Sequence, residues 1–351
     1  MFRVTKLATA ILAGAMVLTA CGGDEEDAAE PKTSGSSSEV QETDVKVGLA
    51  YDIGGRGDQS FNDAAAAGLD KAKSELGVEA TEAEAVQGEP ESAKEERLRL
   101  LAQNGFNPVL GVGFAYSASL AKVAAEFPDT NFAIIDDAGA LGDNIANLTF
   151  AEHEGSFLVG AAAALKSEAG NIGFVGGVEV PLIKKFEAGY TAGAKAVKPD
   201  IEVQVTYLTQ PPDFSGFGDP AKGKTAAEGM YQGGADVVYQ AAGGSGGGVF
   251  EAAQAAGAKA IGVDSDQALT AAEGVREVII TSMLKRVDVA VFDFVKSVVD
   301  DNFQSGEVVF DLEAEGVGYS TTGGQVDDIA TQLDDFKAKI ISGEIEVPTA
   351  P

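Results

Sequence analysis

The sequence predicts an α/β protein with two doubly wound, Rossmann-like lobes around a ligand cleft. From Val45 onward, short apolar runs rich in β-branched residues alternate with Ala-rich stretches of helical periodicity. This alternation is typical of parallel strands connected by helices that cover both faces of a sheet. The strands are too many for one sheet of ordinary width, so we expect two sheets. Ligands of such folds bind beyond the carboxyl ends of the strands.

The expected elements follow one another with short connections. Strands are expected at residues 45–51, 108–113, 132–136, 171–175, 203–208, 237–241, 260–263 and 278–283. Helices are expected at residues 62–76, 117–127, 154–166, 181–197, 222–232, 248–256 and 287–302. Residues 147–153 are expected to cross between the lobes. Lobe 1 is then residues 45–150, completed by about 266–305, and lobe 2 is residues 151–265, completed by about 306–345.

The first twenty residues have the features of an export signal. Arg3 and Lys6 precede an apolar stretch, residues 7–18, which is shorter than the roughly 20 residues of a membrane-spanning helix. Leu-Thr-Ala-Cys at residues 18–21 resembles the bacterial lipobox. We expect residues 1–20 to be removed and Cys21 to carry a lipid that anchors the protein on the extracytoplasmic face of the cell membrane. The alternative is that Cys21 is an ordinary small residue after a signal peptide.

Residues 21–44 are acidic and rich in Gly and Ser, and Val40 is their only large apolar residue. Such a composition buries too little to order itself, so we expect a flexible tether. The whole chain has 55 acidic and 25 basic side chains and a formal net charge of −30. This charge repels nucleic acid and anionic lipid, so nucleic acid is not an expected partner.

The chain has one cysteine and one histidine, His153. A single cysteine excludes an intrachain disulfide, so the fold must depend on its apolar core. A single histidine argues against Ser-His-Asp and Cys-His mechanisms and against multi-histidine metal sites. We therefore expect no enzyme activity, no cofactor and no metal. Asp264 and Asp266 supply only two carboxylates, which is more typical of a solvated turn than of a metal site.

The turn at residues 51–62 (YDIGGRGDQSFN) joins an expected strand to an expected helix. Its glycines allow the backbone to approach a ligand closely, and Ser60 and Asn62 are candidates to cap the helix. Phe61 is a large aromatic residue at a place where polar caps are usual. Its ring either packs as a hydrophobic staple or presents its face to a flat ligand.

Other turns carry polar groups suited to an uncharged, donor-rich ligand. Asp136 and Asp264 end expected strands and accept hydrogen bonds, while Lys285 donates them. The alternatives are caps or turn residues for the carboxylates and an ordinary surface lysine for Lys285. The glycine run at residues 243–248 offers N–H groups at a helix start, or is a flexible connector.

Residues 218–225 (GDPAKGKT) satisfy the P-loop expression G-x-x-x-x-G-K-[ST]. However, Pro220 lacks an N–H that a phosphate cradle would use, and Asp219 repels phosphate. We do not expect nucleotide hydrolysis here.

The turn at residues 51–62 resembles the signature of the basic membrane protein family of lipoproteins, which includes the purine nucleoside receptors of ABC-type importers. Further similar segments follow in order: FAIID at 132–136, IGFVGG at 172–177, FEAG at 186–189, DPAKG at 219–223, GADV at 234–237, IGVDSDQ at 261–267 and TSMLK at 281–285. The resemblance implies the type I periplasmic-binding-protein fold. It also implies a lipid-anchored receptor that captures a nucleoside, with purines preferred, and delivers it to an ABC permease.

The resemblance also implies a set of ligand-binding residues. Two phenylalanines clamp the base in the receptors it resembles, and Phe61 and Phe217 match them. Gly218 departs from the family, which often has Asn there, and Phe186 is an alternative second aromatic. Polar contacts to base and ribose fall on Asp52, Asn62, Asp136, Gly243, Asp264 and Lys285. Stacking of an aromatic side chain on a base stabilises binding by roughly 1–3 kcal/mol.

Other functions stay open at this point. The same fold binds a sugar, a furanose signal or an amino acid, although the chain has no Trp to serve as a sugar platform. An amino acid calls for an arginine facing its carboxylate, and the candidate turns offer only Arg56. An extracellular nucleoside hydrolase and a surface sensor or antigen are the remaining alternatives. We expect a monomer whose lobes close on the ligand by a hinge motion.

Overall fold

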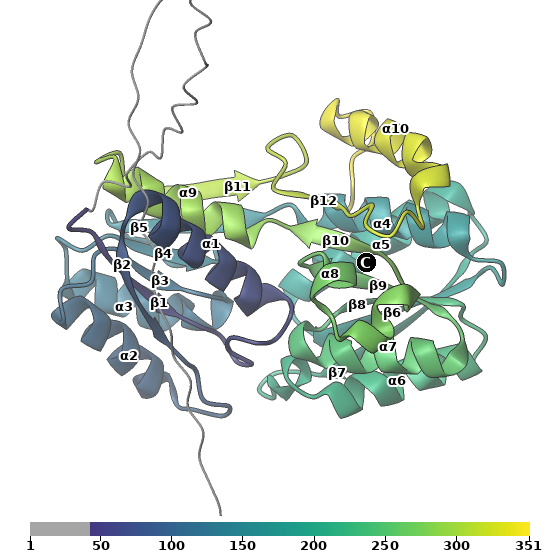
Figure 1. The fold of residues 1–351 in the computed structure, drawn as a ribbon, viewed down its shortest axis with the longest axis horizontal. Coiled ribbons are helices and arrows are strands. Elements are labelled where there is room, and N and C mark those ends of the chain that lie inside the picture. Colours follow the sequence, from purple (N-terminus) through teal and green to yellow (C-terminus); the bar gives the residue numbers. More distant parts are fainter. Residues whose placement is uncertain (1–42) are drawn as a thin grey trace, which may run out of the picture. The chain divides into compact units, whose positions relative to one another are not determined.

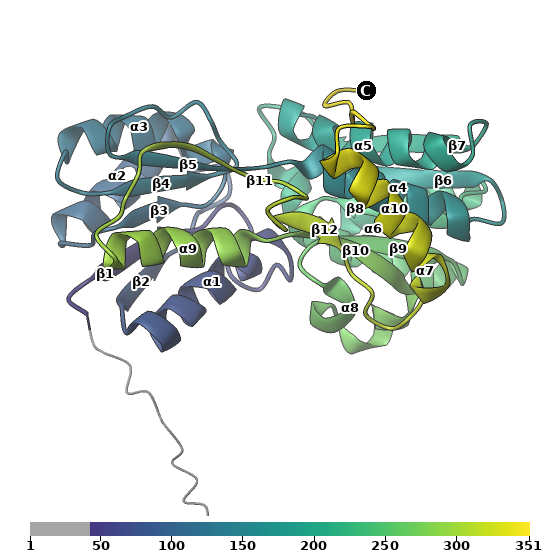
Figure 2. The same cartoon turned by 90° about the horizontal axis from the view of Figure 1, so that it is seen from above.

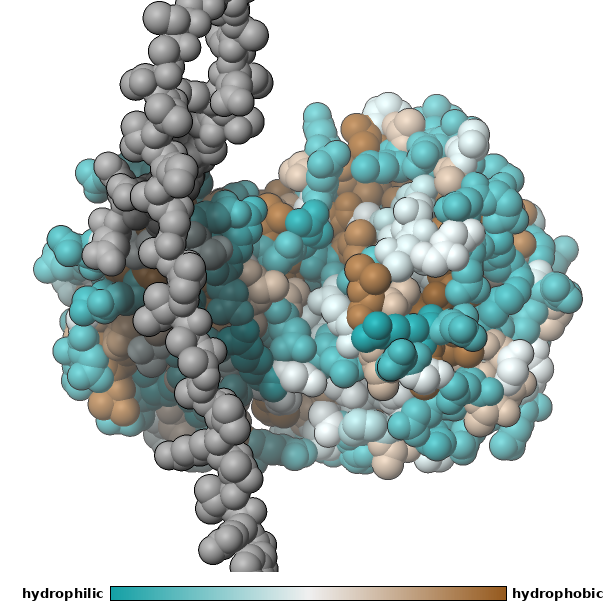
Figure 3. Space-filling model, viewed as in Figure 1, coloured by the Kyte–Doolittle hydropathy of each residue, from teal (hydrophilic) through white to brown (hydrophobic). Residues whose placement is uncertain are grey.

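The computed structural model describes residues 43–351, and the following statements concern only these. Cys21, the expected signal segment and nearly all of the expected tether lie outside the described residues. Within residues 43–351, no helix combines the length and the hydropathy needed to cross a membrane. Hydrophilic side chains predominate on the face seen in Figure 3 where it is not covered by grey atoms, in keeping with the net charge of −30.

Lobe 1 contains a six-stranded, fully parallel sheet (Figure 1). Its strands lie in the order β11 (Gly306–Phe310), β5 (Ile145–Phe150), β4 (Phe132–Ile135), β3 (Val109–Gly111), β1 (Lys46–Ala50) and β2 (Glu79–Ala83). Its helices are α1 (Phe61–Leu76), α2 (Glu91–Gln103), the 3-10 helix η1 (Phe114–Tyr116), α3 (Ser117–Glu126) and α9 (Val287–Val299).

Lobe 2 contains a second six-stranded sheet, parallel except for its antiparallel edge strand β12. Its strands lie in the order β12 (Val317–Tyr319), β10 (Ile279–Lys285), β9 (Lys259–Asp264), β8 (Val237–Ala241), β6 (Asn171–Val178) and β7 (Glu202–Thr209). Its α-helices are α4 (Glu152–Lys166), α5 (Pro181–Val197), α6 (Pro220–Gln232), α7 (Gly246–Ala256), α8 (Gln267–Thr270) and α10 (Ala330–Ile341). Its 3-10 helices are η2 (Ser215–Phe217), η3 (Gly243–Ser245), η4 (Glu273–Val278) and η5 (Asp327–Ile329). The prediction of two doubly wound α/β lobes is confirmed.

Both faces of each sheet are covered by helices, which explains why a central strand such as β4 is apolar at every position. In β4, Phe132 and Ile134 pack into a cluster with α2 and α3, while Ala133 and Ile135 pack into the cluster that contains α1 and α9. Figure 2 shows these helix pairs on opposite sides of the sheet. Successive side chains of a strand point to opposite faces, so a sheet covered twice needs a continuous apolar run.

Three connections pass between the lobes and lie side by side. They are the step from β5 to α4 at Ala151, the step from β10 to α9 at Arg286, and the segment 311–316 between β11 and β12. The Ala151 N–H donates to Phe310 O at 3.0 Å, and the Arg286 N–H donates to Gly316 O at 2.8 Å. These backbone bonds tie the three crossings together, which is the arrangement expected of a hinge.

The sheet topology corrects how the lobes are completed. Residues 266–305 were expected to complete lobe 1, but β10 lies within them and belongs to the sheet of lobe 2. Residues 306–345 were expected to complete lobe 2, but β11 lies within them and belongs to lobe 1. The reason is a third crossing after β11. This edge strand is mostly exposed, so its sequence lacks the longer apolar run on which the expected strands were based.

The expected crossover at residues 147–153 is also shifted. Residues 147–150 are still part of β5 in lobe 1, and α4 begins at Glu152 rather than at Glu154. Two further elements were not predicted and bury little: β2 (EATEA) is an edge strand without a buried residue, and α2 has only three buried residues.

Candidate ligand-binding site between the lobes

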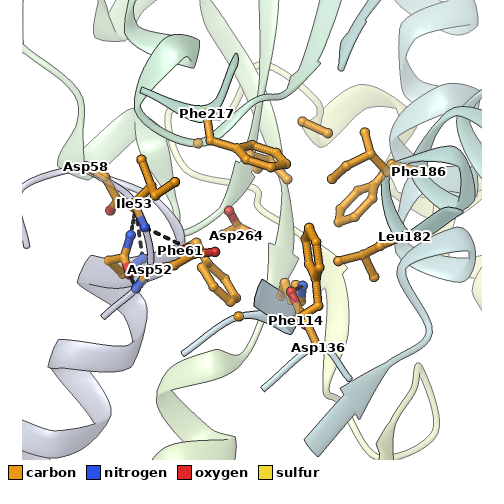
Figure 4. A pocket seen from close by; sticks show the side chains of 17 residues that line it. Asp52, Ile53, Asp58, Phe61, Phe114, Asp136, Leu182, Phe186, Phe217 and Asp264 are labelled. Carbon is orange, nitrogen blue, oxygen red and sulfur yellow. Dashed lines mark hydrogen bonds and ion pairs between the residues drawn. The ribbon is translucent and has the colours of Figure 1, made fainter. Parts of the chain in front are cut away.

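A cavity lies at the carboxyl ends of strands from both lobes. It encloses about 580 Å³ of space free of protein atoms, counting the part that opens to solvent. All eight residues named from the sequence line it: Asp52, Phe61, Asn62, Asp136, Phe217, Gly243, Asp264 and Lys285. Figure 4 labels Asp52, Phe61, Asp136, Phe217 and Asp264 among the side chains around the cavity. The structure thus brings the candidate residues to one place, while their role in binding stays a prediction.

Nine further residues line the cavity: Ile53, Asp58, Gly113, Phe114, Leu182, Ile183, Phe186, Ala241 and Val263. Sequence reasoning missed most of them. A signal for Phe114 was present, because it directly follows the expected strand at residues 108–113 and so belongs to a strand-to-helix turn. Leu182 and Ile183 lie in the first turn of α5, at the start of the helix expected at residues 181–197, so their position carried a similar signal.

The two phenylalanines come from different lobes. Phe61 is the first residue of α1, and Phe217 is the last residue of η2. A Cβ atom on Gly177 would lie 2.5 Å from Phe217 Cδ1, so only glycine lets the Phe217 ring lie where it does. Phe186 also lines the cavity, but its side chain is buried in the core and therefore has a packing role as well.

The start of α1 is capped by a residue that the sequence analysis did not name. Ser60 and Asn62 were the candidate caps, and neither side chain caps the helix. Instead the Asp58 carboxylate accepts from the N–H groups of Ser60, Asn62 and Asp63 at 2.9–3.1 Å. A carboxylate satisfies several of the free N–H groups at once and suits the positive end of the helix dipole. The Ser60 hydroxyl is thereby free for another partner.

Asn62 holds the backbone next to Asp52. Its Oδ1 accepts from the Asp52 N–H at 3.0 Å, and its Nδ2 donates to Asp58 at 3.0 Å. Asp52 accepts from the Ile53 N–H at 2.7 Å. A Cβ on Gly113, which has φ +99°, would lie 2.4 Å from Asp52 Oδ2, so this glycine leaves the space that the carboxylate occupies.

Asp136 and Asp264 share an unusual backbone conformation. Asp136 directly follows β4 with φ 67°, and Asp264 ends β9 with φ 61°. Residues other than glycine adopt positive φ rarely, although Asp and Asn tolerate it better than most. Backbone strain of this kind collects at binding and catalytic sites. Both carboxylates line the cavity as a result.

Lys285 is almost completely buried at the end of β10. Its Nζ lies 2.5 Å from Asp136 Oδ2 and 3.5 Å from Glu152 Oε1, and all three side chains are at most 5% exposed. The ammonium also lies 5.0 Å from the centroid of the Phe61 ring, within range of a cation–π interaction. Burial lowers the pKa of Lys285, but Asp136, Glu152 and Asp264 outweigh it, and the net shift is upward.

Burial dominates the protonation of the carboxylates. It raises the pKa of Asp52, of Asp58 and of Asp136 to about 6 each, and it raises the pKa of Asp264. Lys285 opposes this shift at Asp136 and Asp264. Four carboxylates and one ammonium line the cavity. The cavity is therefore electronegative at neutral pH.

Hydrogen bonds cross between the lobes beside the cavity. Ser60 Oγ donates to Asp264 Oδ2 at 2.6 Å, and Ser265 Oγ donates to Ser60 O at 3.1 Å. Gln267 Nε2 donates to Gln59 O at 2.9 Å. These bonds connect the start of α1 to the segment after β9, so they form only when the lobes are together.

The rejected motifs have structural roles. Pro220 opens α6, Asp219 accepts from the Lys222 N–H at 3.1 Å as the helix cap, and Lys224 pairs with Glu251. Asp266 accepts from Ser320 Oγ at 2.8 Å. Within residues 43–351 no group of three or more His, Cys, Asp or Glu side chains is arranged to hold a metal ion.

Comparisons with known proteins agree with this architecture. Residues 45–350 match the family described as "Bmp: ABC transporter substrate-binding protein PnrA-like". The ABC transporter nucleoside-binding protein BmpA of Lactococcus lactis is 33% identical over 99% of both chains. An uncharacterized lipoprotein of Pyrococcus abyssi is 37% identical over 81% of this chain and 71% of its own length. The crystal structure of an ABC transporter solute-binding protein from Aeropyrum pernix has a TM-score of 0.76 and 32% identity, covering 87% of this chain and 93% of its own.

Proposed function

Because the chain belongs to the Bmp family of PnrA-like ABC transporter substrate-binding proteins, we propose that its ligand is a nucleoside, with purines preferred, which it delivers to an ABC importer. The observation that carries the proposal is one cavity in which Phe61 of lobe 1 and Phe217 of lobe 2 accompany four carboxylates and one buried ammonium. The name of the Lactococcus lactis relative, a nucleoside-binding protein, supports the same ligand class.

The aromatic part of the cavity suits a flat heterocycle. Phe61 and Phe217 offer ring faces, and stacking on a base contributes roughly 1–3 kcal/mol per base. Asp52 and Asn62, next to Phe61, supply an acceptor and an amide that recognise the edge of a base. Since a stacked purine covers more ring area than a pyrimidine, purines are the preferred ligands in this proposal.

The charged part of the cavity suits a sugar with free hydroxyl groups. Asp136 and Asp264 accept hydrogen bonds from hydroxyls, and Lys285 donates to a hydroxyl oxygen. A phosphate group would face four carboxylates and one ammonium, so nucleotides are excluded by repulsion. The ligand class is thus the free nucleoside rather than the nucleotide.

Binding is coupled to closure of the lobes. A ligand held by Phe61 on one side and by Phe217 and Gly243 on the other contacts both lobes at once. Such a ligand binds the closed arrangement more tightly than the open one and shifts the equilibrium toward it. A permease then distinguishes the loaded receptor from the empty one by its closed form.

The alternative ligands find less support. Arg56, the residue that an amino acid would need, pairs with Glu82 at 2.8 Å and with Asp70, and it does not line the cavity. A furanose or other sugar would use the charged part of the cavity and leave the aromatic part without a partner. A surface sensor or antigen remains compatible with the same binding site.

The proposed membrane attachment rests on the sequence and on the name of the Pyrococcus abyssi relative, a lipoprotein. Palmitate labelling of the expressed protein, with Cys21→Ala as the control, tests it. Label on the parent chain and none on the variant is the expected result. Label on neither chain would contradict the anchor while leaving the ligand untouched.

The ligand is tested by isothermal titration of protein that has been unfolded and refolded to remove any copurified molecule. Adenosine, guanosine, inosine and uridine are compared with galactose, ribose and a mixture of amino acids. We expect one saturable site for the purine nucleosides and weaker binding of uridine. Binding of a sugar or an amino acid with no response to any nucleoside would overturn the ligand class. Release of free base during incubation would instead indicate an enzyme.

A further inference from the structure

A buried carboxylate lies directly behind the cavity without lining it. Glu152 is the first residue of α4, at the crossing between the lobes, and its side chain is 1% exposed. Its Oε1 lies 3.5 Å from Lys285 Nζ, and its Oε2 accepts from Lys185 Nζ at 3.2 Å. An isolated buried carboxylate is costly, so its two lysine partners explain how the fold tolerates it.

We propose that Glu152 is a specificity-determining residue, which shares the Lys285 ammonium with Asp136 and so sets the negative charge that the cavity presents to a ligand. This inference rests on the proposed function, because it assigns a determinant of selection between uncharged and anionic nucleosides. Glu152 is a positioning residue in this scheme, since it acts through Lys285 and not on the ligand.

The contacts around Lys285 carry the proposal. Asp136 Oδ2 accepts a hydrogen bond from Lys285, while Asp136 Oδ1 and Glu152 Oε1 are buried without a hydrogen-bond partner. Two carboxylates thus compete for one ammonium, and neither is fully satisfied. The free Asp136 oxygen belongs to a residue that lines the cavity, where a ligand hydroxyl is a suitable donor.

The charges that face Asp136 come from several elements. Lys285 on β10 and Lys185 on α5 lower the pKa of Asp136, whereas burial and Glu152 on α4 raise it. Asp264 on β9, together with Asp52 and Asp58 in the turn after β1, completes the set of titratable groups at the cavity. When the charge of Glu152 is removed, the Lys285 ammonium interacts only with Asp136 and Asp264. The cavity then becomes less negative, and the pKa of Asp136 falls.

The geometry gives the expected size of the effect. Coulomb interactions at an effective dielectric constant of about 20 remain substantial over several ångströms when the charges are buried. Glu152 is shielded from solvent, so its charge acts on an anionic ligand through the cavity wall. Removing it is expected to weaken discrimination against an anion by about tenfold, a change of about 1.4 kcal/mol.

The experiment uses the isosteric variant Glu152→Gln and two ligands that differ almost only in charge, adenosine 5′-carboxamide and adenosine 5′-carboxylate. The ratio of their dissociation constants is measured for the parent and for the variant. Glu154→Gln is the matched control, because it makes the same change two residues away on the same helix. Glu154 accepts from the Leu312 N–H at 3.0 Å at the crossing and has no contact with Lys285.

We expect Glu152→Gln to lower the preference for the carboxamide about tenfold and Glu154→Gln to leave it unchanged. Lys185→Met provides a second variant, in which we expect the preference for the carboxamide to rise. Lys185 pairs with Glu152, so its removal leaves the charge of Glu152 less neutralised. A purely structural role for Glu152 would weaken both ligands equally, and an unchanged ratio in the variant would overturn the proposal.

A measurement without ligand separates this inference from the proposed function. The carboxyl carbon of Asp136 is titrated by NMR in the empty protein. Its pKa is expected to fall in Glu152→Gln and to rise in Lys185→Met. If the parent binds no nucleoside but Asp136 responds in this way, the ligand class fails and the role of Glu152 stands. If Asp136 titrates identically in all three proteins, the role of Glu152 is wrong.

Discussion

Ser60 of lobe 1 donates a hydrogen bond to Asp264 of lobe 2, with 2.6 Å between Oγ and Oδ2. Both side chains are buried, and the two residues are 204 positions apart in the chain. The bond exists because Asp58 caps α1 in place of Ser60 and so leaves the hydroxyl free. It joins a cavity carboxylate to the opposite lobe, and it therefore links closure of the lobes to the arrangement of the site.

Replacing Ser60 is expected to weaken ligand binding by loosening the closed form. Ser60→Ala leaves the Asp264 carboxylate without its hydroxyl donor, and hydrogen bonds to charged groups contribute about 1.5–3 kcal/mol. We expect the apparent affinity for adenosine to fall about tenfold or more, mainly through faster dissociation. Stopped-flow fluorescence and small-angle scattering measure these effects.

The control for Ser60→Ala is Ser74→Ala on the same helix, where the hydroxyl donates only to Lys71 O and is exposed. Ser74→Ala should change neither the affinity for adenosine nor the dissociation rate. Equal dissociation rates for Ser60→Ala and the parent would mean that the cross-lobe bond contributes nothing to closure.

Replacing Phe61 tests the stacking platform. The ring lines the cavity and lies at the start of α1, outside the fully buried core. Phe61→Ala is expected to weaken purine binding by roughly 1–3 kcal/mol, which is about fivefold to 150-fold in the dissociation constant, with little loss of folded protein. Calorimetry gives the affinity, and circular dichroism reports the fold.

Phe303→Ala is the matched control, because Phe303 is a partly buried aromatic that packs on Phe294 of α9, away from the cavity. This variant is expected to lose some stability and keep its affinity. If Phe61→Ala binds adenosine as tightly as the parent, stacking on Phe61 is excluded.

The pH dependence of stability tests the burial of Asp52. Burial raises the pKa of this group to about 6 in the folded protein, above its ordinary value of 3.8. The folded state then binds the proton more tightly than the unfolded chain does. The contribution of the Asp52 carboxyl group to the free energy of unfolding is therefore full below about pH 4 and is lost as pH rises through 6.

Asp52→Asn removes this titration. The ligand-free variant is expected to be more stable than the parent at pH 7, by up to about 3 kcal/mol, since one pKa unit corresponds to about 1.4 kcal/mol. The difference should vanish near pH 4. Urea unfolding at pH 4, 5, 6 and 7 measures it, with the exposed Asp200→Asn as control. A stability difference between Asp52→Asn and the parent that grows as pH falls would contradict the predicted direction.

Close packing of two helices in lobe 2 depends on glycine. A Cβ on Gly193 of α5 would lie 1.9 Å from Phe157 O of α4, so the two backbones touch at this point. Gly193→Ala must push the helices apart and is expected to cost about 1–3 kcal/mol in the free energy of unfolding. Gly229→Ala on α6 meets no atom within 4 Å and is expected to stabilise by up to about 1 kcal/mol. Urea denaturation of both variants checks this contrast, and stabilisation by Gly193→Ala would refute the packing argument.

The parallel sheets were predictable because a strand that is buried on both faces has apolar residues at consecutive positions. The run Phe132–Ile135 has this pattern, and the turn after it carries Asp136. The same logic located Phe61, Gly243, Asp264 and Lys285, since in a doubly wound lobe every strand-to-helix turn opens toward the same edge. Phe217 was predicted from the resemblance to the basic membrane protein family alone. An edge strand such as β11 lacks such a long apolar run, because it faces solvent and pairs with a strand that is far away in the sequence.

The sequence by itself therefore determined the α/β alternation and the turns that meet at the cavity, because these depend on local periodicity and chain direction. Only the tertiary structure decided that β10 and β11 belong to opposite lobes, that Asp58 caps α1, and that Glu152 reaches Lys285. The lobe of each strand and the contact of Glu152 with Lys285 depend on which segments, more than a hundred residues apart, lie side by side. The cap of α1 depends on which of several neighbouring polar side chains accepts the hydrogen bonds of the free N–H groups. Local pattern holds no information about either, because hydrogen bonds and ion pairs form between residues that only the folded chain brings together.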